Sequence, residues 1–247
     1  METIFWLNAL IFRGNMILQV QRMRVQEMNC LCPLLTLKPM NLSFKLYGTR
    51  VREQTIKKLA NNLSICSKDI FYDEQATGKF PFDLMRTVWT TDRNNSETHR
   101  VILQDDIDIC NGFQNICYQI ANAHPDKIIS LFPFDYQTKK DGELNKISPY
   151  RRVGIISGCA LLLPVPIIDS FFGWVDYCST DKHFNKLPET IMLRIFSNDA
   201  HIPVITTIPS TVQHIGDESL VYPNAPIRRT EYFEKNPIAD WSSKIIL

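Results

Sequence analysis

The stretch HRVILQDDIDIC, residues 99–110, decides the fold class and marks one edge of the domain. Its apolar run at 101–103 is typical of a buried strand, and Asp105, Asp106 and Asp108 follow it closely. Carboxylates are rarely buried unless they are paired or bound to a metal. A core strand that ends in three acids therefore needs an explanation, either in the fold or in a ligand.

Segments with strand character and segments with helix character alternate on both sides of this stretch. The helical segments carry apolar residues at helical spacing, such as Ile56, Leu59 and Leu63. Strands are predicted at 42–48, 69–74, 100–106, 127–134 and from 203 onward, where a loop follows as far as 216. Helices are predicted at 49–63, 82–92, 110–124, 166–178 and 187–200, and the apolar segment 153–164 is interrupted by Gly158. This alternation predicts an α/β fold, a three-layer α/β/α sandwich with a mostly parallel central sheet.

Composition excludes several classes of protein. The 247 residues carry a net charge of +1, so no global basic field indicates a nucleic-acid-binding protein, although the pairs Arg151–Arg152 and Arg228–Arg229 can form a local patch. The seven cysteines have no regular spacing, and the C-x-C of Cys30 and Cys32 lacks the partners of a zinc site. Free, buried thiols in a reducing compartment are expected, which places the chain in the cytoplasm.

The two ends of the chain differ from the middle. The apolar start is cut by Arg13 after about a dozen residues, whereas a transmembrane helix needs roughly 20, so no transmembrane segment is predicted. Residues 1–39 are expected to be an extension, either a packed helix or a disordered segment. The domain itself is predicted at 40–235, and a C-terminal tail at 236–247.

Two explanations fit the acid cluster. In open α/β sheets ligands bind beyond the carboxyl ends of the strands, where these acids are expected to lie. Mg²⁺ or Mn²⁺ bound by carboxylates and substrate phosphates would remove the charge conflict. In the other explanation, Asp106 or Asp108 caps the helix that begins near Gly112.

Two later residues are candidates for the same site. His214 is predicted in a loop after a strand, where a neutral imidazole can complete a metal sphere or simply pack against the backbone. Glu189 follows Pro188 at a helix start and is a candidate general base for an acceptor hydroxyl. Asp199, near the end of that helix, is the rival, and spacing alone does not separate the two.

Five segments together resemble a known family. They are LYGTRVREQTIKKLANNL, FYDE, HRVILQDDIDIC, GIISGCALLLP and IPSTVQHIGDESLV. In this order they are similar to small GT-A-type glycosyltransferases, in particular the compact ones encoded by bacteriophages. In those enzymes a strand ends in V-x-Q-D-D and a late W-P-S-L-V-x-H motif precedes a short tail. The resemblance covers roughly residues 40–235 and implies a GT-A-like sandwich.

The resemblance also implies roles for individual residues. Asp106 matches the metal-binding last acid of the D-x-D motif and His214 the late histidine that joins the metal. Gln104 stands where the first acid is usual, a departure from the pattern, and Asp105 lies between them; both are expected to contribute to the nucleotide-sugar site. Glu189 matches an acid at a helix start, which favours it over Asp199 as the base.

The nucleotide-binding half is implied at 40–135 and the acceptor half at 150–235. In the first half, Tyr47, Gly48 and Arg50 would hold the base and the phosphates of the donor, and Asp73 would recognise its ribose or base. In the second half, the SGCA segment around Gly158 would line the acceptor side.

The expected function is that of a metal-dependent glycosyltransferase that uses Mn²⁺ or Mg²⁺. It would move a hexose or pentose from a nucleotide sugar, expected to be a UDP-sugar, to an acceptor hydroxyl. The acceptor would be a hydroxymethylated base in phage DNA, a polysaccharide or a protein, and the location the host cytoplasm. The alternative is a non-catalytic nucleotide-binding module with a degraded site. A kinase is disfavoured because no P-loop is present.

Overall fold

The computed structural model describes residues 39–74, 82–133, 149–152, 156–179, 187–216 and 229–243. The chain divides into two compact units, Met1–Pro39 and Met40–Leu247, and the fold described below is that of the second unit. Apart from Pro39, the residues of the predicted N-terminal extension lie outside the described part, as do Cys30 and Cys32.

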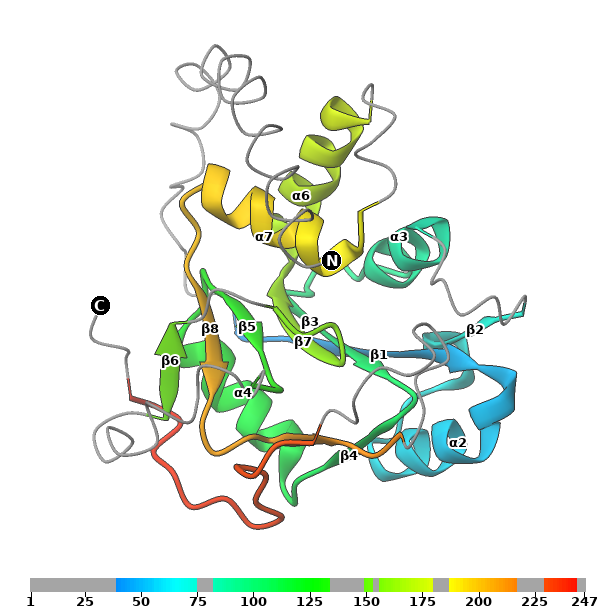
Figure 1. Ribbon diagram of the computed structural model, residues 1–247, viewed down its shortest axis with the longest axis vertical. Coiled ribbons are helices and arrows are strands. Elements are labelled where there is room, and N and C mark those ends of the chain that lie inside the picture. The colour runs from blue at the N-terminus through cyan, green and yellow to red at the C-terminus, as the bar shows by residue number, and fades with distance from the viewer. Residues whose placement is uncertain are drawn as a thin grey trace, which may run out of the picture. The chain divides into compact units, whose positions relative to one another are not determined.

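A seven-stranded sheet forms the centre of the domain, in the order β2-β1-β3-β7-β5-β8-β6 (Figure 1). The strands are β1 Leu42–Thr49, β2 Ile70–Asp73, β3 His99–Gln104, β5 Ile128–Ser130, β6 Tyr150–Arg152, β7 Ala160–Pro164 and β8 Val204–Thr207. β1 is parallel to β2 and β3, and β5 is parallel to β8. Because β7 is antiparallel to both β3 and β5, these two run the same way, and only β7 and β6 oppose the rest. The sheet is mostly parallel, as predicted.

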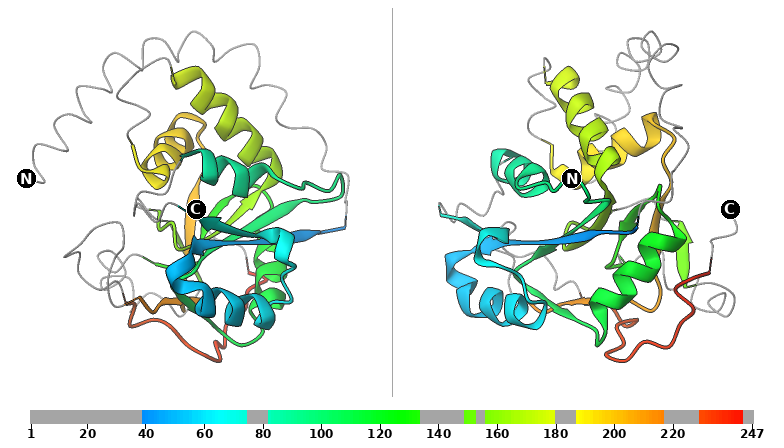
Figure 2. Two further views of the ribbon diagram at one scale, coloured as in Figure 1. Left: turned by 90° about the vertical axis from the view of Figure 1, so that its right-hand side faces the viewer. Right: turned by 180° about the vertical axis from the view of Figure 1, so that it is seen from behind.

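Helices cover both faces of the sheet, as the views in Figures 1 and 2 agree. They are α2 Glu53–Asn62, α3 Phe82–Thr90, α4 Phe113–Ala123, α6 Val165–Cys178 and α7 Glu189–Asp199. Successive strand residues alternate between two cores: Val101 and Leu103 pack with α2 and α4, whereas Ile102 packs with α3, α6 and α7. The described residues therefore form a three-layer α/β/α arrangement.

Two features differ from the predicted elements. The segment 49–63 begins with a 3₁₀ turn, Arg50–Arg52, before α2 starts at Glu53. The predicted loop near residue 214 contains a short strand, β9 Val212–His214, which pairs antiparallel with β4 Ile107–Ile109. These three-residue strands depend on each other for their hydrogen bonds, so neither has a signal of its own in the sequence.

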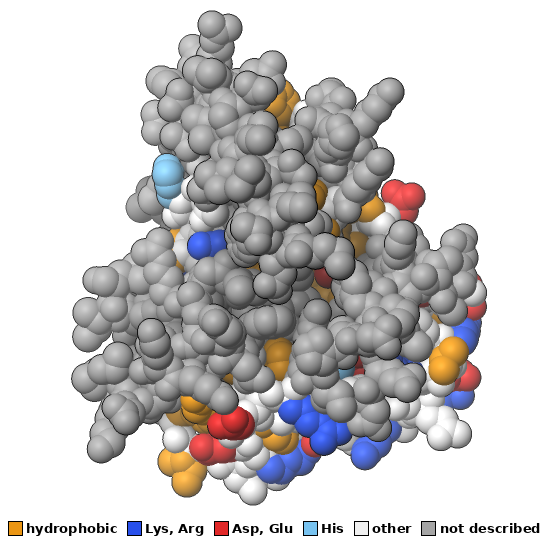
Figure 3. Space-filling model, viewed as in Figure 1, with side chains coloured by type: hydrophobic (Ala, Val, Ile, Leu, Met, Phe, Trp, Pro, Cys, Tyr) orange, Lys and Arg blue, Asp and Glu red, His pale blue; other side chains and the backbone are white. Residues whose placement is uncertain are grey.

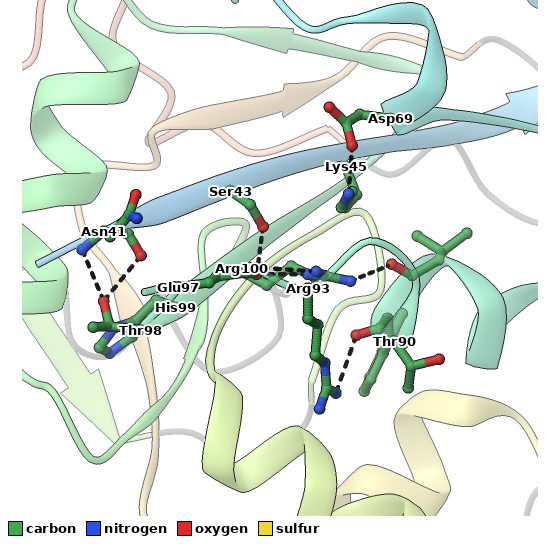
Figure 4. Close-up of polar contacts among 12 residues, drawn as sticks. Asn41, Ser43, Lys45, Asp69, Thr90, Arg93, Glu97, Thr98, His99 and Arg100 are labelled. Atoms are coloured by element: carbon green, nitrogen blue, oxygen red, sulfur yellow. Dashed lines mark hydrogen bonds and ion pairs between the residues drawn. The ribbon is translucent and has the colours of Figure 1, made fainter. Parts of the chain in front are cut away.

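A buried polar network lies at the opposite end of β3 from the acid cluster (Figure 4). Arg100 is fully buried; its Nε and Nη2 donate to Glu97, and its Nη1 donates to the carbonyl of Val88 in α3. The hydroxyl of Ser43 in β1 also donates to Glu97. This network ties α3 to β1 and β3, so we assign it a structural role.

The C-terminal segment packs on the domain. Trp241, which the sequence places in a tail, is buried in the core on the α2/α4 side. The hydroxyl of Tyr150 donates a hydrogen bond to the carbonyl of Trp241, and the two rings contact edge to face. Among the described helices, none is long and apolar enough to cross a membrane.

Candidate functional site

Asp105 is fixed against the first strand-to-helix loop. β1 and β3 are parallel neighbours, with Tyr47 opposite Gln104, so the residues that follow each strand meet at one edge. The amide of Thr49 donates to Asp105 Oδ2 at 2.8 Å. A Cβ atom at Gly48 would lie only 2.2 Å from Asp105 Cβ, so this position admits no side chain. Gly48, predicted to approach a donor phosphate, has the observed role of making room for Asp105.

The pairing of β4 with β9 brings Asp106 to His214. In this pairing Ile107 lies opposite His214, and Asp106 precedes it. His214 Nε2 lies 3.1 Å from Asp106 Oδ2, and the amide of Ile215 donates to the carbonyl of Asp106 at 2.8 Å. Residues 108 positions apart in the chain therefore form one pair.

Among the described residues, Arg52 is the arginine that contacts both Asp105 and Asp106, and the sequence analysis did not single it out. Its Nη1 lies 2.7 Å from Asp106 Oδ2 and 3.2 Å from Asp105 Oδ1. Arg50, the predicted phosphate ligand, turns away: its guanidinium donates to Glu74 and lies 3.8 Å from the ring centroid of Tyr72. A 3₁₀ turn advances about 120° per residue, so side chains two positions apart point to different sides. Only the geometry of the turn distinguishes the two arginines.

The two carboxyl groups titrate differently because their environments differ. Burial raises the pKa of Asp105 despite the Thr49 amide and Arg52. Burial also acts to raise the pKa of Asp106, but the hydrogen bond and charge of His214, with the charge of Arg52, outweigh it and lower the pKa below its usual value. Asp106 is therefore the more acidic of the two carboxyl groups.

The donor atoms at Asp106 fit a divalent cation in part. Asp106 Oδ1 and His214 Nδ1 are buried, and neither has a hydrogen-bond partner among the described residues. An orphaned carboxylate oxygen next to an imidazole is the kind of donor set that Mn²⁺ or Mg²⁺ accepts when phosphates and water supply the other ligands. Within the described ranges, no group of three or more His, Cys, Asp or Glu side chains is arranged for a metal. The protein side of such a site would thus be small and open.

A second cluster lies on the other face of the β1 and β3 ends. Gln104 Nε2 donates to the hydroxyl of Tyr47 at 2.8 Å, and this hydroxyl donates to the carbonyl of Gly158 at 3.3 Å. A Cβ atom at Gly158 would lie 2.9 Å from Glu189 Oε1 and 3.6 Å from Gln104 Nε2. The predicted nucleotide residues Tyr47 and Gln104 therefore belong with Glu189 and Gly158, residues predicted for the acceptor half.

Tyr47 connects the two clusters electrostatically. Burial raises its pKa well above the ordinary value, and the negative charges of Glu189 and, more weakly, Asp106 add to the shift. Its hydroxyl therefore stays protonated and remains a hydrogen-bond donor. The strand period explains the division: Tyr47 and Gln104 point to one face, and Gly48 and Asp105 to the other.

The helix-capping explanation of the acids is wrong. α4 begins at Phe113 with Gly112 as its N-cap, and no side chain caps it. Asp108 lies within β4, and both of its oxygens accept from Lys235 Nζ at 2.9 Å. A strand follows the acids directly, so neither Asp106 nor Asp108 is placed at the helix start.

The remaining candidates lie at separate places. Asp73 is buried at the carboxyl end of β2, opposite Thr49, and thus borders the first strand-to-helix loop. Glu189 is in the first turn of α7, and Asp199 is ten residues further on, about 15 Å away along the helix. Of these two acids, only Glu189 therefore lies beside Gly158.

Comparison with known proteins gives no assignment: no protein-family model matches the chain, and no curated protein is similar to it at a significant level.

Proposed function

We propose that the chain is a metal-dependent glycosyltransferase of GT-A-like fold that transfers a sugar from a nucleotide sugar to an acceptor hydroxyl. One observation carries the proposal: Asp106, at the carboxyl end of a parallel strand, pairs with His214 from a distant segment and keeps a buried, unpartnered oxygen. Ligands of open α/β sheets bind at this edge. An acid and an imidazole that meet there are more readily explained by a cation and a diphosphate than by folding alone.

The donor would bind between the first strand-to-helix loop and the acid pair. A bound Mn²⁺ or Mg²⁺, held by Asp106 and His214, would supply neutralisation of charge on the leaving diphosphate. Asp73 borders the same loop and is suited to bind a ribose hydroxyl or the base. The Asp105 carboxyl holds the loop in place through the Thr49 amide.

Glu189 would take the proton from the acceptor hydroxyl. It lies beside Gly158, which has no side chain to displace it, and at the N-terminus of α7, where the helix dipole favours its ionised form. An ionised carboxylate is what a general base requires. Tyr47 and Gln104 belong to the same cluster as Glu189 and would position the acceptor rather than the donor.

The surface charge bears on the choice of acceptor. A hydroxymethylated base in DNA would require a basic surface. On the face drawn in Figure 3, basic side chains gather along the lower part with acidic ones among them, and the chain as a whole is near neutral. Of the two arginine pairs, only the side chain of Arg229 is among those described. A saccharide or protein hydroxyl therefore remains as good a candidate as DNA.

A non-catalytic nucleotide-binding module is the second candidate. Two observations favour it: Arg52 and His214 both contact Asp106 Oδ2, and Gln104 stands where an acid would be expected in a metal-binding motif. Such a module would bind a nucleoside diphosphate without cleaving a nucleotide sugar.

Hydrolysis of UDP-glucose and other nucleotide sugars, with and without Mn²⁺, tests the proposal. We expect Mn²⁺-dependent release of the nucleotide by the wild type and its loss in Asp106→Ala. Asp108→Ala is the matched control, because Asp108 pairs with Lys235 at the surface. Full turnover by Asp106→Ala with Mn²⁺ present would refute the metal assignment. Binding without any turnover by the wild type would favour the second candidate.

A further inference from the structure

We infer that Arg52 exchanges partners during donor binding: it is the counter-ion of Asp105 and Asp106, and it passes to the donor diphosphate when a divalent cation takes its place. The inference rests on the proposed function and deepens it. It gives a role to a residue that neither the sequence pattern nor the resemblance singled out.

The contacts of Arg52 place it where a cation is needed. A single nitrogen, Nη1, contacts one oxygen of each carboxylate, Asp106 Oδ2 at 2.7 Å and Asp105 Oδ1 at 3.2 Å. Asp106 Oδ2 also lies 3.1 Å from His214 Nε2. A divalent cation held by Asp106 and His214 would therefore lie against the guanidinium. Two positive charges at one carboxylate group repel each other, so a bound cation disfavours the present position of the guanidinium.

The guanidinium has a new partner within reach once it leaves the acids. A diphosphate on the cation brings at least two negative oxygens to the same edge of the sheet. Guanidinium groups bind such oxygens in a bidentate geometry that an ammonium cannot copy. The displaced Arg52 side chain would thus keep an ionic partner throughout and never be left as an unpaired charge.

The fold allows this movement. Arg52 ends the 3₁₀ turn Arg50–Arg52, in which no residue is buried, and its side chain is 20% exposed. The carboxylates it would leave are much less exposed, at 7% for Asp105 and 11% for Asp106. The arginine can therefore turn without disturbing the core, whereas the acids are fixed by the Thr49 amide and by the β4–β9 pairing.

Binding measurements on Arg52→Gln test the exchange. The readouts are the affinity for Mn²⁺ alone, by calorimetry or electron paramagnetic resonance, and the affinity for UDP at saturating Mn²⁺. Loss of the competing charge should tighten Mn²⁺ binding, and loss of the phosphate contact should weaken UDP binding, each by about tenfold. Arg52→Lys keeps the charge, so its Mn²⁺ affinity should return toward that of the wild type. If Arg52→Gln folds poorly, Arg52→Lys still provides a test, because it keeps the charge but cannot copy the bidentate contact with the diphosphate.

Lys57→Gln is the matched control. It removes one positive charge from the helix that follows the turn, where Lys57 pairs with Glu53 at the surface, and it should leave both affinities unchanged. If the wild type binds Mn²⁺ and UDP but Arg52→Gln does not bind Mn²⁺ more tightly, the exchange is refuted and the proposed function stands. Tighter Mn²⁺ binding with unchanged UDP affinity refutes the transfer to the diphosphate. A wild type that binds neither ligand refutes the proposed function, and the inference with it.

Discussion

Replacing Gly48 with alanine is expected to destabilise the domain strongly. The added methyl carbon would lie 2.2 Å from Asp105 Cβ and 2.3 Å from Asp105 Cγ. Carbon atoms in contact normally lie about 3.5–4.0 Å apart, so the overlap exceeds roughly 1 Å. Because Asp105 Cβ is attached directly to the backbone, rotation of the side chain cannot relieve this clash. The end of β1 or the segment after β3 must move.

Two terms set the size of the effect. Overpacking of a closely packed site costs about 1–3 kcal/mol. The movement also breaks the hydrogen bond from the Thr49 amide to the Asp105 carboxylate, and bonds to charged groups contribute about 1.5–3 kcal/mol. Together they predict a loss of about 3–6 kcal/mol in the free energy of unfolding.

Guanidinium chloride unfolding and the melting temperature measure this loss. For a domain of this size, 1 kcal/mol corresponds to about 2–4 °C, so the melting temperature should fall by roughly 6–24 °C. Gly173→Ala is the control, because Gly173 lies within α6 and a Cβ there would meet nothing within 4 Å. It should stabilise the domain by about 0.5–1 kcal/mol. A Gly48→Ala protein within about 1 kcal/mol of the wild type would contradict the reasoning.

Three further predictions test other parts of the structure. Burial lowers the pKa of His99 from 6.5 to about 4, so between these pH values the unfolded chain takes up a proton and the native protein does not. About 3 kcal/mol of stability should therefore be lost as the pH falls through this window. Urea unfolding of His99→Gln at a series of pH values should lack that loss. Glu97→Gln leaves the fully buried Arg100 without its counter-charge and should lower the free energy of unfolding by about 3–5 kcal/mol. Adding Arg100→Met should recover part of this loss. Equal free energies of unfolding for the single and the double variant would contradict the prediction. Glu189→Gln should lower sugar transfer by about 10²–10⁴-fold with UDP affinity unchanged, and Asp199→Asn should not; the opposite order would make Asp199 the base.

The sequence was sufficient for the layers of the fold. The apolar run at 101–103 and the helical spacing of Ile56 and Leu59 predicted β3 and α2 correctly, because burial of apolar side chains follows the period of each element. The acids after β3 also predicted the edge of the sheet at which Asp106 and His214 meet. Strand direction is a different matter: β7 has the same apolar composition as a parallel strand, yet it runs antiparallel.

Only the tertiary structure decided which residues meet at that edge. Asp106 reaches His214 through the pairing of two three-residue strands, and Arg52 rather than Arg50 reaches the acids because of one 3₁₀ turn. The same strand period that predicts a buried face places Tyr47 and Gln104 on the side opposite Gly48 and Asp105. Local periodicity determines whether a residue is buried, because burial depends on its own element. Which charges neutralise one another depends on contacts between distant segments, and no pattern within one segment contains them.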